Sequence, residues 1–139
     1  MAGANLESGV SQVNVIAVGL DLVDVARVER LLDRHGTRAL DRLLIGEERE
    51  YCLSQAVPAR HVAARIAAKE ATYKALSQAG TDRVIWWHHV EVTRDRNGRP
   101  TIEFHGRGRE SAEELAVSDS LLSITHSDTA AAAVVILLR

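Results

Sequence analysis

The order of apolar and polar positions divides the chain into strand-like and helix-like segments. Residues 13–22 are rich in Val and Ile and are predicted to form a strand, buried on both faces for much of its length. A helix is expected next, with Asp24 as its N-cap and Gly36 at its end. Its apolar residues recur at helical spacing: Val25, Val28, Leu31 and Leu32. The pattern thus starts with a strand that leads directly into an amphipathic helix.

The longest predicted helix spans about residues 59–79, between Pro58 and Gly80. Short helical turns are expected before it, and a strand that carries two tryptophans after it. Asn97-Gly98 then marks a hairpin turn. By residue number, the sequence predicts helical turns over 37–55, strands over 84–94, 101–105, 121–126 and 130–138, and a short helix over 110–115. This order predicts a single α+β domain over residues 13–139 with a mainly antiparallel sheet, after a loose leader over residues 1–12.

Lys69 stands in the long helix where an apolar residue is expected. At about 100° per residue, Lys69 falls inside the apolar arc and Glu70 lies at its border. The apolar side chains of that arc are Val62, Ile66, Tyr73 and Leu76. An unpaired buried ion is costly, so this charge has to be paired, hydrated in a cleft or bound to a ligand. A lysine in a partly buried site is suited to holding phosphate or to proton transfer.

The composition limits the possible functions. A chain of 139 residues, 46% hydrophobic and 26% charged, provides one domain with a small core. Its net charge of −2 gives no general attraction to nucleic acid or anionic lipid, so a charged partner must meet a local patch. The single cysteine, Cys52, excludes an intramolecular disulfide and fits a reducing compartment. No targeting peptide and no apolar run of ~18 residues is present. We therefore expect a soluble cytoplasmic protein that binds neither nucleic acid nor membrane.

Two carboxylates are candidate metal ligands. Asp21 stands at the end of the first strand, where it either caps the following helix or, if Asp24 does so, is left without a structural task. Glu70 lies on the long helix, and Lys74 four residues later could form an ordinary surface pair with it. Two carboxylates completed by phosphate oxygens and water would suit Mg²⁺. Their spacing in the sequence does not show that the two residues are close in space.

Other charged residues allow two interpretations each. Arg27, Arg30 and Arg34 form one stripe along the first helix, which is either a solvated face or a docking surface for an acidic partner. His126 ends a predicted strand, where a lone histidine is more often structural than catalytic. The residue pattern alone does not decide between these readings.

Four segments together resemble a known family. They are VGLDLVDVARVERLL, ARIAAKEATYKAL, DRNGRP and LLSITHSDTAAAAVVI. In this order and at these separations they resemble the holo-acyl-carrier-protein synthases of the 4′-phosphopantetheinyl transferase superfamily, from about residue 16 to the C-terminus. The resemblance implies a magnesium-dependent transferase of fatty-acid biosynthesis. Such an enzyme moves 4′-phosphopantetheine from coenzyme A to a serine of an acyl carrier protein and releases adenosine 3′,5′-bisphosphate.

The resemblance implies a role for each residue of the Lys69 region. Asp21 and Glu70 match the family's Mg²⁺ ligands, and the ion would also bind the pyrophosphate of coenzyme A. Lys69 and Lys74 match lysines near the phosphates, so that Glu70, Lys74 and Lys69 form the expected catalytic set. On this hypothesis Lys69 and Glu70 border a cleft at a subunit edge. Phosphoryl transfer depends mainly on positioning and charge neutralisation, which these residue types can supply.

The resemblance also implies binding surfaces. Arg65 and His126 match positions that, with Lys69 and Lys74, help to hold coenzyme A. Arg27 matches the arginine that meets the acidic recognition helix of the carrier protein, and Arg30 and Arg34 extend the same docking stripe. Short members of the family assemble as trimers with active sites between subunits. A homotrimer is therefore expected.

Two departures from the family pattern bear on nucleotide binding. The glycine-rich G-T-G that usually follows K-A-L is replaced by Ser77-Gln78-Ala79 before Gly80, and Thr125 stands where the S-x-S-H pattern has serine. Two alternatives remain beside the leading interpretation. One is the same reaction on a polyketide or peptide synthetase carrier. The other is a non-catalytic coenzyme A-binding subunit, against which the intact Asp21, Glu70 and Lys74 argue.

Overall fold

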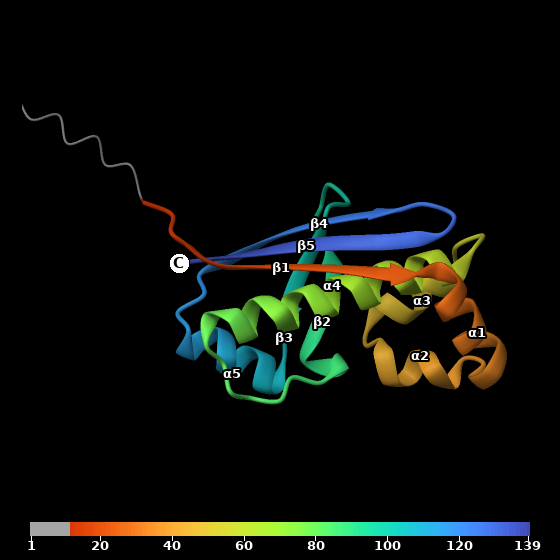
Figure 1. Cartoon of the computed structure of the whole chain (residues 1–139), viewed down its shortest axis with the longest axis horizontal. Coiled ribbons are helices and arrows are strands. Elements are labelled where there is room, and N and C mark those ends of the chain that lie inside the picture. The colour runs from red at the N-terminus through yellow and green to blue at the C-terminus, as the bar shows by residue number, and fades with distance from the viewer. Residues whose placement is uncertain (1–11) are drawn as a thin grey trace, which may run out of the picture.

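A computed structural model of the chain describes residues 12–139, so the expected leader lies outside the described residues except for its last position. The elements form an α+β fold with antiparallel sheets, as expected from the sequence (Figure 1). In chain order they are β1 (Val15–Asp24), α1 (Val25–His35), α2 (Arg38–Leu43), α3 (Glu47–Leu53), α4 (Pro58–Ala79), the 3-10 turn η1 (Trp87–His89), β2 (Val90–Arg94), β3 (Pro100–Phe104), α5 (Gly106–Glu114), β4 (Asp119–His126) and β5 (Ala130–Leu138).

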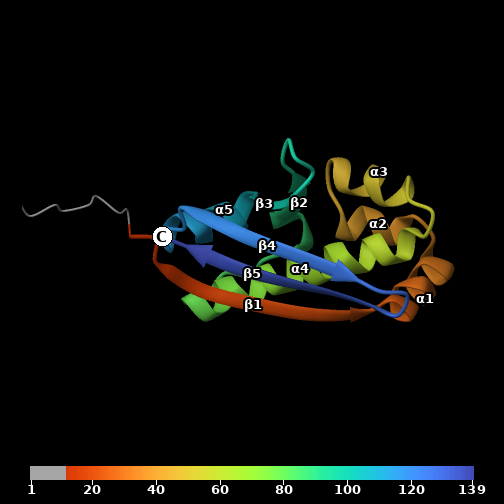
Figure 2. The same ribbon diagram turned by 90° about the horizontal axis from the view of Figure 1, so that it is seen from above.

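The main sheet has three antiparallel strands in the order β1-β5-β4, and β2 and β3 form a separate hairpin. Figure 2 looks onto the sheet and shows α4 running beneath it, with α1, α2 and α3 gathered at one end. The sheet therefore has one face covered by α4, while the short helices surround the point where β1 passes into α1.

Helix α4 has the ends that its sequence predicts. Pro58 occupies the first turn, where a missing N–H costs nothing, and Gly80 closes the helix with a left-handed φ of 111°. Most of its sides are buried, and small residues make this possible: Ala59, Ala63, Ala64, Ala67, Ala68, Ala71 and Ala75 are all buried. No described helix, α4 included, is apolar enough over its length to cross a membrane.

Strand β1 lies unusually close to α4 at one point. A Cβ built on Gly19 would lie 1.8 Å from the carbonyl oxygen of Ala71. Only a residue without a side chain fits there, so the backbones of β1 and α4 are in direct contact. This contact lies two residues before Asp21 on the strand and next to Glu70 on the helix.

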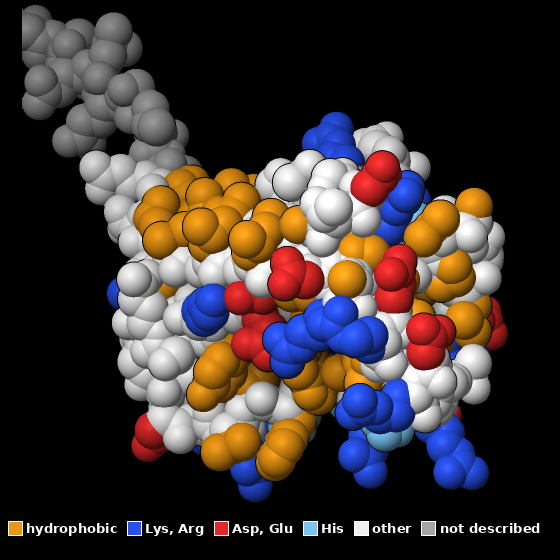
Figure 3. Space-filling view, turned by 45° about the vertical axis from the view of Figure 1, so that its right-hand side comes forward, with side chains coloured by type: hydrophobic (Ala, Val, Ile, Leu, Met, Phe, Trp, Pro, Cys, Tyr) orange, Lys and Arg blue, Asp and Glu red, His pale blue; other side chains and the backbone are white. Residues whose placement is uncertain are grey.

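The other face of β1 is exposed, so the expectation that β1 is buried on both faces is wrong for the single chain. Val18, Leu20 and Leu22 point away from α4 and are 48%, 65% and 69% exposed. Paired residues of antiparallel strands point to the same side, which extends this surface across β5 and β4. We call it the outer sheet face; its apolar members are Val18, Leu20, Leu22, Leu121, Val134 and Ile136. Figure 3 shows hydrophobic side chains gathered into a patch at the upper left of the molecule.

The segment before β2 differs from the prediction. Residues 84–89 are not a strand, and β2 begins only at Val90. The backbone N–H of Trp86 donates to Nδ1 of His89, and the carbonyl of Trp87 accepts a hydrogen bond from Lys69, so these groups are not available to a strand ladder. The hairpin that follows is as predicted, because the Asp95 carboxylate accepts the N–H groups of Asn97 and Arg99.

Candidate active site

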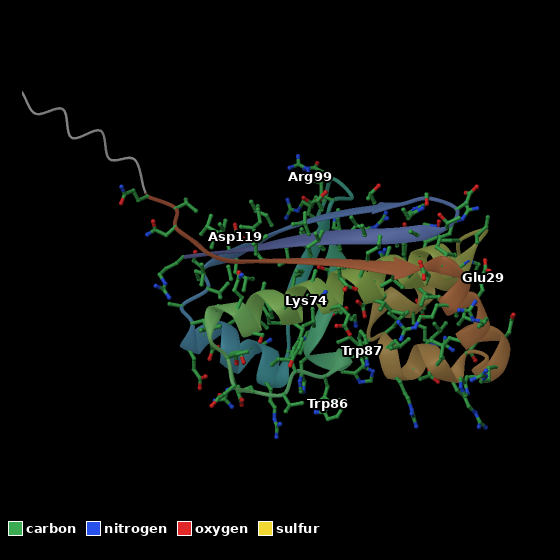
Figure 4. The ribbon with its side chains drawn as sticks, viewed as in Figure 1. Glu29, Lys74, Trp86, Trp87, Arg99 and Asp119 are labelled. Carbon is green, nitrogen blue, oxygen red and sulfur yellow. The ribbon has the colours of Figure 1, made fainter. Side chains whose placement is uncertain are left out.

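A cavity of about 620 Å³ lies where the end of β1 meets α1 and α4. Its lining brings together six residues that the sequence singled out: Asp21, Arg27, Arg30, Arg34, Glu70 and Lys74. Its apolar wall includes Leu31, Leu43, Ile66 and Trp87. Figure 4 shows Lys74 and Trp87 on the same side of β1, and Figure 3 shows acidic and basic side chains close together on this part of the surface. Strand β1 and helices α1 and α4 thus place two carboxylates and four basic side chains around one cavity.

The two carboxylates of the cavity affect each other. Burial raises the pKa of Glu70, the negative charge of Asp21 raises it further, and the charges of Lys74 and Arg27 oppose both effects. Lys74 Nζ donates to Asp21 Oδ1 at 2.8 Å and to the Leu20 carbonyl at 3.1 Å, and this hydrogen bond to Asp21 raises the pKa of Lys74. The Asp24 side chain makes no capping hydrogen bond to α1. Asp21 lines the cavity, where its carboxylate is paired with Lys74.

Lys69 does not lie in this cavity, and the expectation that it contacts phosphate is not met. Its side chain is buried, and its amine donates to the Leu43 carbonyl at 2.7 Å, to Glu48 Oε2 at 2.8 Å and to the Trp87 carbonyl at 3.0 Å. An ammonium group has three N–H donors, so none remains for a ligand. Although Lys69 borders a smaller cavity of about 220 Å³, its charge is paired. Pairing was one of the three possibilities that the sequence left open.

Glu48 is the partner that sequence reasoning missed. It follows Glu47 and precedes Arg49 and Glu50, and a run of such charges usually indicates a solvated helix face. In the structure Glu48 is 2% exposed, whereas Glu47 and Glu50 are exposed. The available signal was weak: Glu48 and Cys52 lie four residues apart, and both point into the core from α3.

Arg65 and His126 lie in a second group of residues, which does not line the 620 Å³ cavity. We call this group the Tyr51 cluster; it consists of Tyr51, His61, Arg65, Arg94 and His126. The guanidinium carbons of Arg65 and Arg94 lie 4.4 and 4.1 Å from the centre of the Tyr51 ring. The His61 ring lies 5.7 Å from the Tyr51 ring and 5.2 Å from the His126 ring.

The Tyr51 cluster is suited to binding an anion. Burial lowers the pKa of His61, and the basic groups of His126, Arg65 and Arg94 lower it further. Arg65 is 5% exposed, and its buried Nε has no hydrogen-bond partner among the described residues. A buried donor without a partner is costly, and a bound phosphate would relieve both this cost and the crowding of positive charge.

The family of the chain follows from comparison with known proteins. The family model described as the 4′-phosphopantetheinyl transferase superfamily matches residues 17–135. The chain belongs to this superfamily. A holo-[acyl-carrier-protein] synthase from Alkalilimnicola ehrlichii is 44% identical over 124 residues, which cover 88% of this chain and 96% of the relative.

Solved structures of phosphopantetheinyl transferases agree with this assignment. The acyl carrier protein synthase of Mycobacterium tuberculosis superposes with a TM-score of 0.68 at 34% identity, over 89% of this chain and 97% of that chain. The holo-[acyl-carrier-protein] synthase of Helicobacter pylori in complex with coenzyme A superposes with a TM-score of 0.73 at 27% identity, over 86% of this chain and 98% of that chain. The fold and the family are therefore established over nearly the whole described chain.

The carboxylates that line the cavity are suitable ligands for the Mg²⁺ ion expected in a phosphopantetheinyl transferase. Asp21 and Glu70 offer two anionic ligands, and Mg²⁺ commonly binds one or two carboxylates together with substrate phosphates. A different group of three possible ligands, Glu91, Glu103 and His105, lies on the β2–β3 hairpin. Its histidine Nε2 lies within hydrogen-bond distance of Glu91 Oε2, at 2.7 Å, a contact that needs no metal. It shares no residue with the cavity.

Proposed function

We propose that the protein is a holo-[acyl-carrier-protein] synthase, which transfers 4′-phosphopantetheine from coenzyme A to a serine of an acyl carrier protein. The proposal rests on the cavity in which Asp21, Glu70 and Lys74 meet below a row of arginines. Relatives with this name cover most of the chain, and one solved relative binds coenzyme A. A coenzyme A-dependent reaction on a carrier protein also fits the cytoplasmic location expected from the sequence.

The reaction requires positioning and charge neutralisation more than covalent chemistry by the protein. The serine hydroxyl oxygen attacks the phosphorus that carries the pantetheine and loses its proton to solvent. The bond from that phosphorus to the bridging oxygen breaks, and adenosine 3′,5′-bisphosphate leaves with the electron pair. Asp21 and Glu70 would hold Mg²⁺, which when bound neutralises the pyrophosphate. The Lys74 side chain is 51% exposed, so its amine can turn from Asp21 towards a phosphate oxygen. Lys74 is thus the phosphate-binding lysine of this proposal, and Lys69 is not.

The Tyr51 cluster is proposed to hold a phosphate of the coenzyme A nucleotide. Its basic groups and the unpartnered Nε of Arg65 support this role. The cluster and the 620 Å³ cavity have no lining residue in common. One coenzyme A molecule can contact both sites if they come from neighbouring copies of the chain.

A homotrimer is proposed on the basis of the outer sheet face. Leu20 and Leu22 are each more than 60% exposed, and they belong to a continuous apolar surface on three strands. Large exposed apolar patches mark interaction sites. Packing of this face against another copy would bury it and would bring the cavity of one chain towards the Tyr51 cluster of the next.

The arginine stripe is proposed as the docking surface for the carrier protein. Arg27, Arg30 and Arg34 are exposed on α1 and also line the cavity, so a partner held there lies beside the reacting phosphate. An acidic carrier helix is complementary to this rim. Whether the carrier serves fatty-acid, polyketide or peptide synthesis is decided by offering each to the protein.

The decisive experiment is mass spectrometry of an apo carrier protein after incubation with this protein, coenzyme A and Mg²⁺. We expect the gain of one phosphopantetheine, with most turnover lost in Asp21→Asn and Glu70→Gln. Glu29→Gln is the matched control, because Glu29 is an exposed carboxylate on α1 that does not line the cavity (Figure 4). No modification of any carrier would leave a non-catalytic coenzyme A-binding protein as the better interpretation.

The assembly is tested separately by sedimentation and by mixing variants. Leu20→Glu on the outer sheet face should yield monomers, whereas Leu53→Glu, on an exposed leucine of α3, should leave the trimer intact. A mixture of inactive Asp21→Asn and Arg65→Ala chains should recover activity if each site draws its cavity and its Tyr51 cluster from two chains. A fully active monomer would contradict the shared site.

A further inference from the structure

The buried amine of Lys69 connects three segments that are distant in the sequence. It lies on α4 and donates to the carbonyl at the end of α2, to a carboxylate on α3 and to the carbonyl at the start of η1. These acceptors belong to Leu43, Glu48 and Trp87. The side chains of Lys69 and Glu48 are 2% and 0% exposed, so water does not compete for these hydrogen bonds. Burial lowers the pKa of Lys69 and the charge of Glu48 opposes this, as in a buried ion pair.

Glu48 extends the connection to two more backbone groups. Its Oε2 also accepts the N–H of Ile45 at 2.9 Å, and its Oε1 accepts the N–H of Val92 at 2.6 Å. The carboxylate therefore links the start of α3 to strand β2, while the lysine links both to α4. Breaking a buried pair by removing one partner is strongly destabilising, because a charge is left without compensation.

The residue type at position 69 fits this task specifically. The chain contains fifteen arginines but only two lysines, Lys69 and Lys74, both on α4. An ammonium group directs three donors to three different sides, whereas a guanidinium is planar and larger. The three acceptors of Lys69 lie on three separate elements, an arrangement that suits an ammonium group and not a planar fork.

Two of the three segments form a wall of the candidate active site. Leu43 and Trp87 line the 620 Å³ cavity together with Glu70, and Glu70 is the next residue after Lys69 on α4. We propose that Lys69 and Glu48 are positioning residues, which fix the Leu43–Trp87 wall relative to the helix that carries Glu70. Lys69 then acts on the reaction through the shape of the cavity and not by contact with substrate.

The two tryptophans of the chain report on this wall directly. They are the adjacent residues Trp86 and Trp87, and Trp86 is 63% exposed while Trp87 is partly buried. If the Lys69 hydrogen bond is lost, the segment should move away from α4 and Trp87 should become accessible. Acrylamide quenching of tryptophan fluorescence and hydrogen exchange over residues 85–92 measure this without any activity assay. The structural part of the inference is therefore independent of the proposed function; only its kinetic part rests on it.

The test uses the double variant Glu48→Gln/Lys69→Met, which leaves no unpaired buried charge. Glutamine keeps one carbonyl oxygen, which can accept the Val92 N–H, so the variant removes the ties to Leu43 and Trp87 together with the acceptor of the Ile45 N–H. We expect stronger quenching, faster exchange over residues 85–92 and a fall in kcat/KM of about 10²-fold, the cost that a 1 Å misplacement can have. Lys69→Arg, although it keeps the charge, should not restore the wild-type values.

Cys52→Ala is the matched control. Cys52 is 0% exposed and lies close enough to Glu48 and Lys69 for their charges to affect its pKa, but it makes no hydrogen bond to the wall. It should lower the melting temperature and leave quenching, local exchange and kcat/KM unchanged. Wild-type quenching, exchange and kcat/KM in the double variant, or the same changes in Cys52→Ala, would overturn the inference. Failure of the wild type to modify a carrier would refute the proposed function, while the fluorescence result would still decide this one.

Discussion

Replacing Gly19 by alanine should damage both the stability of the fold and the metal site. The new Cβ would lie 1.8 Å from the Ala71 carbonyl oxygen and 2.7 Å from its carbon, whereas ordinary contacts begin at 3.4 Å. The contacted atoms are helix backbone and cannot turn aside as a side chain can. Strand β1 and helix α4 therefore have to separate locally by about 1.6 Å, the difference between 3.4 and 1.8 Å.

The expected loss of stability follows from this overlap. Overpacking of a core costs about 1–3 kcal/mol, and a clash between backbones should reach the upper end, about 3 kcal/mol. For a chain of this size that corresponds to a fall in melting temperature of roughly 10 °C. The same separation moves Asp21 away from Glu70, and displacements of about 1 Å can cost about 10²-fold in rate. We expect the Mg²⁺ concentration for half-maximal transfer to rise as well.

Thermal unfolding by circular dichroism and a Mg²⁺ titration of the transfer rate measure the two effects. Gly98→Ala is the control: Gly98 has a φ of +77°, and a Cβ there meets nothing within 4 Å. It should cost about 1 kcal/mol through backbone strain and leave the Mg²⁺ dependence unchanged. A Gly19→Ala protein that melts at the wild-type temperature would refute the packing argument. One that melts early but keeps the wild-type Mg²⁺ dependence would refute the link to the metal site.

Three further results are expected. Because the pKa of Glu70 is raised above 4.5 in the folded state, its protonated form favours folding, and this contribution is lost as the pH rises through the folded pKa. In EDTA, the melting temperature of Glu70→Gln should therefore rise relative to that of the wild type as the pH increases from about 4 to 7. A difference in melting temperature that does not change with pH would contradict the shift. An amine-acylating reagent should modify Lys74 but not Lys69 in the native protein and both after denaturation, as read by peptide mass spectrometry, since their side chains are 51% and 2% exposed; modification of native Lys69 would contradict its burial. Arg27→Ala should raise the KM for the carrier and reduce its salt dependence, with little effect on coenzyme A binding, because exposed charges act on encounter and are screened by salt; an unchanged carrier KM would mean that docking occurs elsewhere.

The elements set by local signals were predicted well. Helix α4 starts and ends within a residue of its predicted bounds, because Pro58 and Gly80 act on their own neighbours. The hairpin turn at Asn97-Gly98 is equally local. Residues 84–89 were wrongly predicted as strand, since the group that holds the Trp87 carbonyl comes from Lys69, 18 residues earlier in the chain.

The candidate site was predictable only in part. That Asp21 and Glu70 lie at one cavity follows from the family resemblance and not from their spacing, because the contact between β1 and α4 is a property of the fold. The partner of Lys69 lies 21 residues away in a short helix whose sequence resembles a solvated surface. The exposed face of β1 carries the larger apolar side chains, Val18, Leu20 and Leu22, and the face against α4 carries Ala17, Gly19 and Val23, so apolar character alone could not show which face α4 covers.

The small side chains of α4 also determine which substitutions this protein can accept. A core built from alanines against a nearby sheet has almost no room for growth, so Ala67, Ala68 and Ala71 should tolerate little beyond glycine, serine or cysteine. In a library of single variants, α4 should therefore reject larger hydrophobic residues, which most cores accept, as firmly as polar ones. Sequence variation should instead collect on exposed positions such as Ser77 and Gln78 at the end of the same helix.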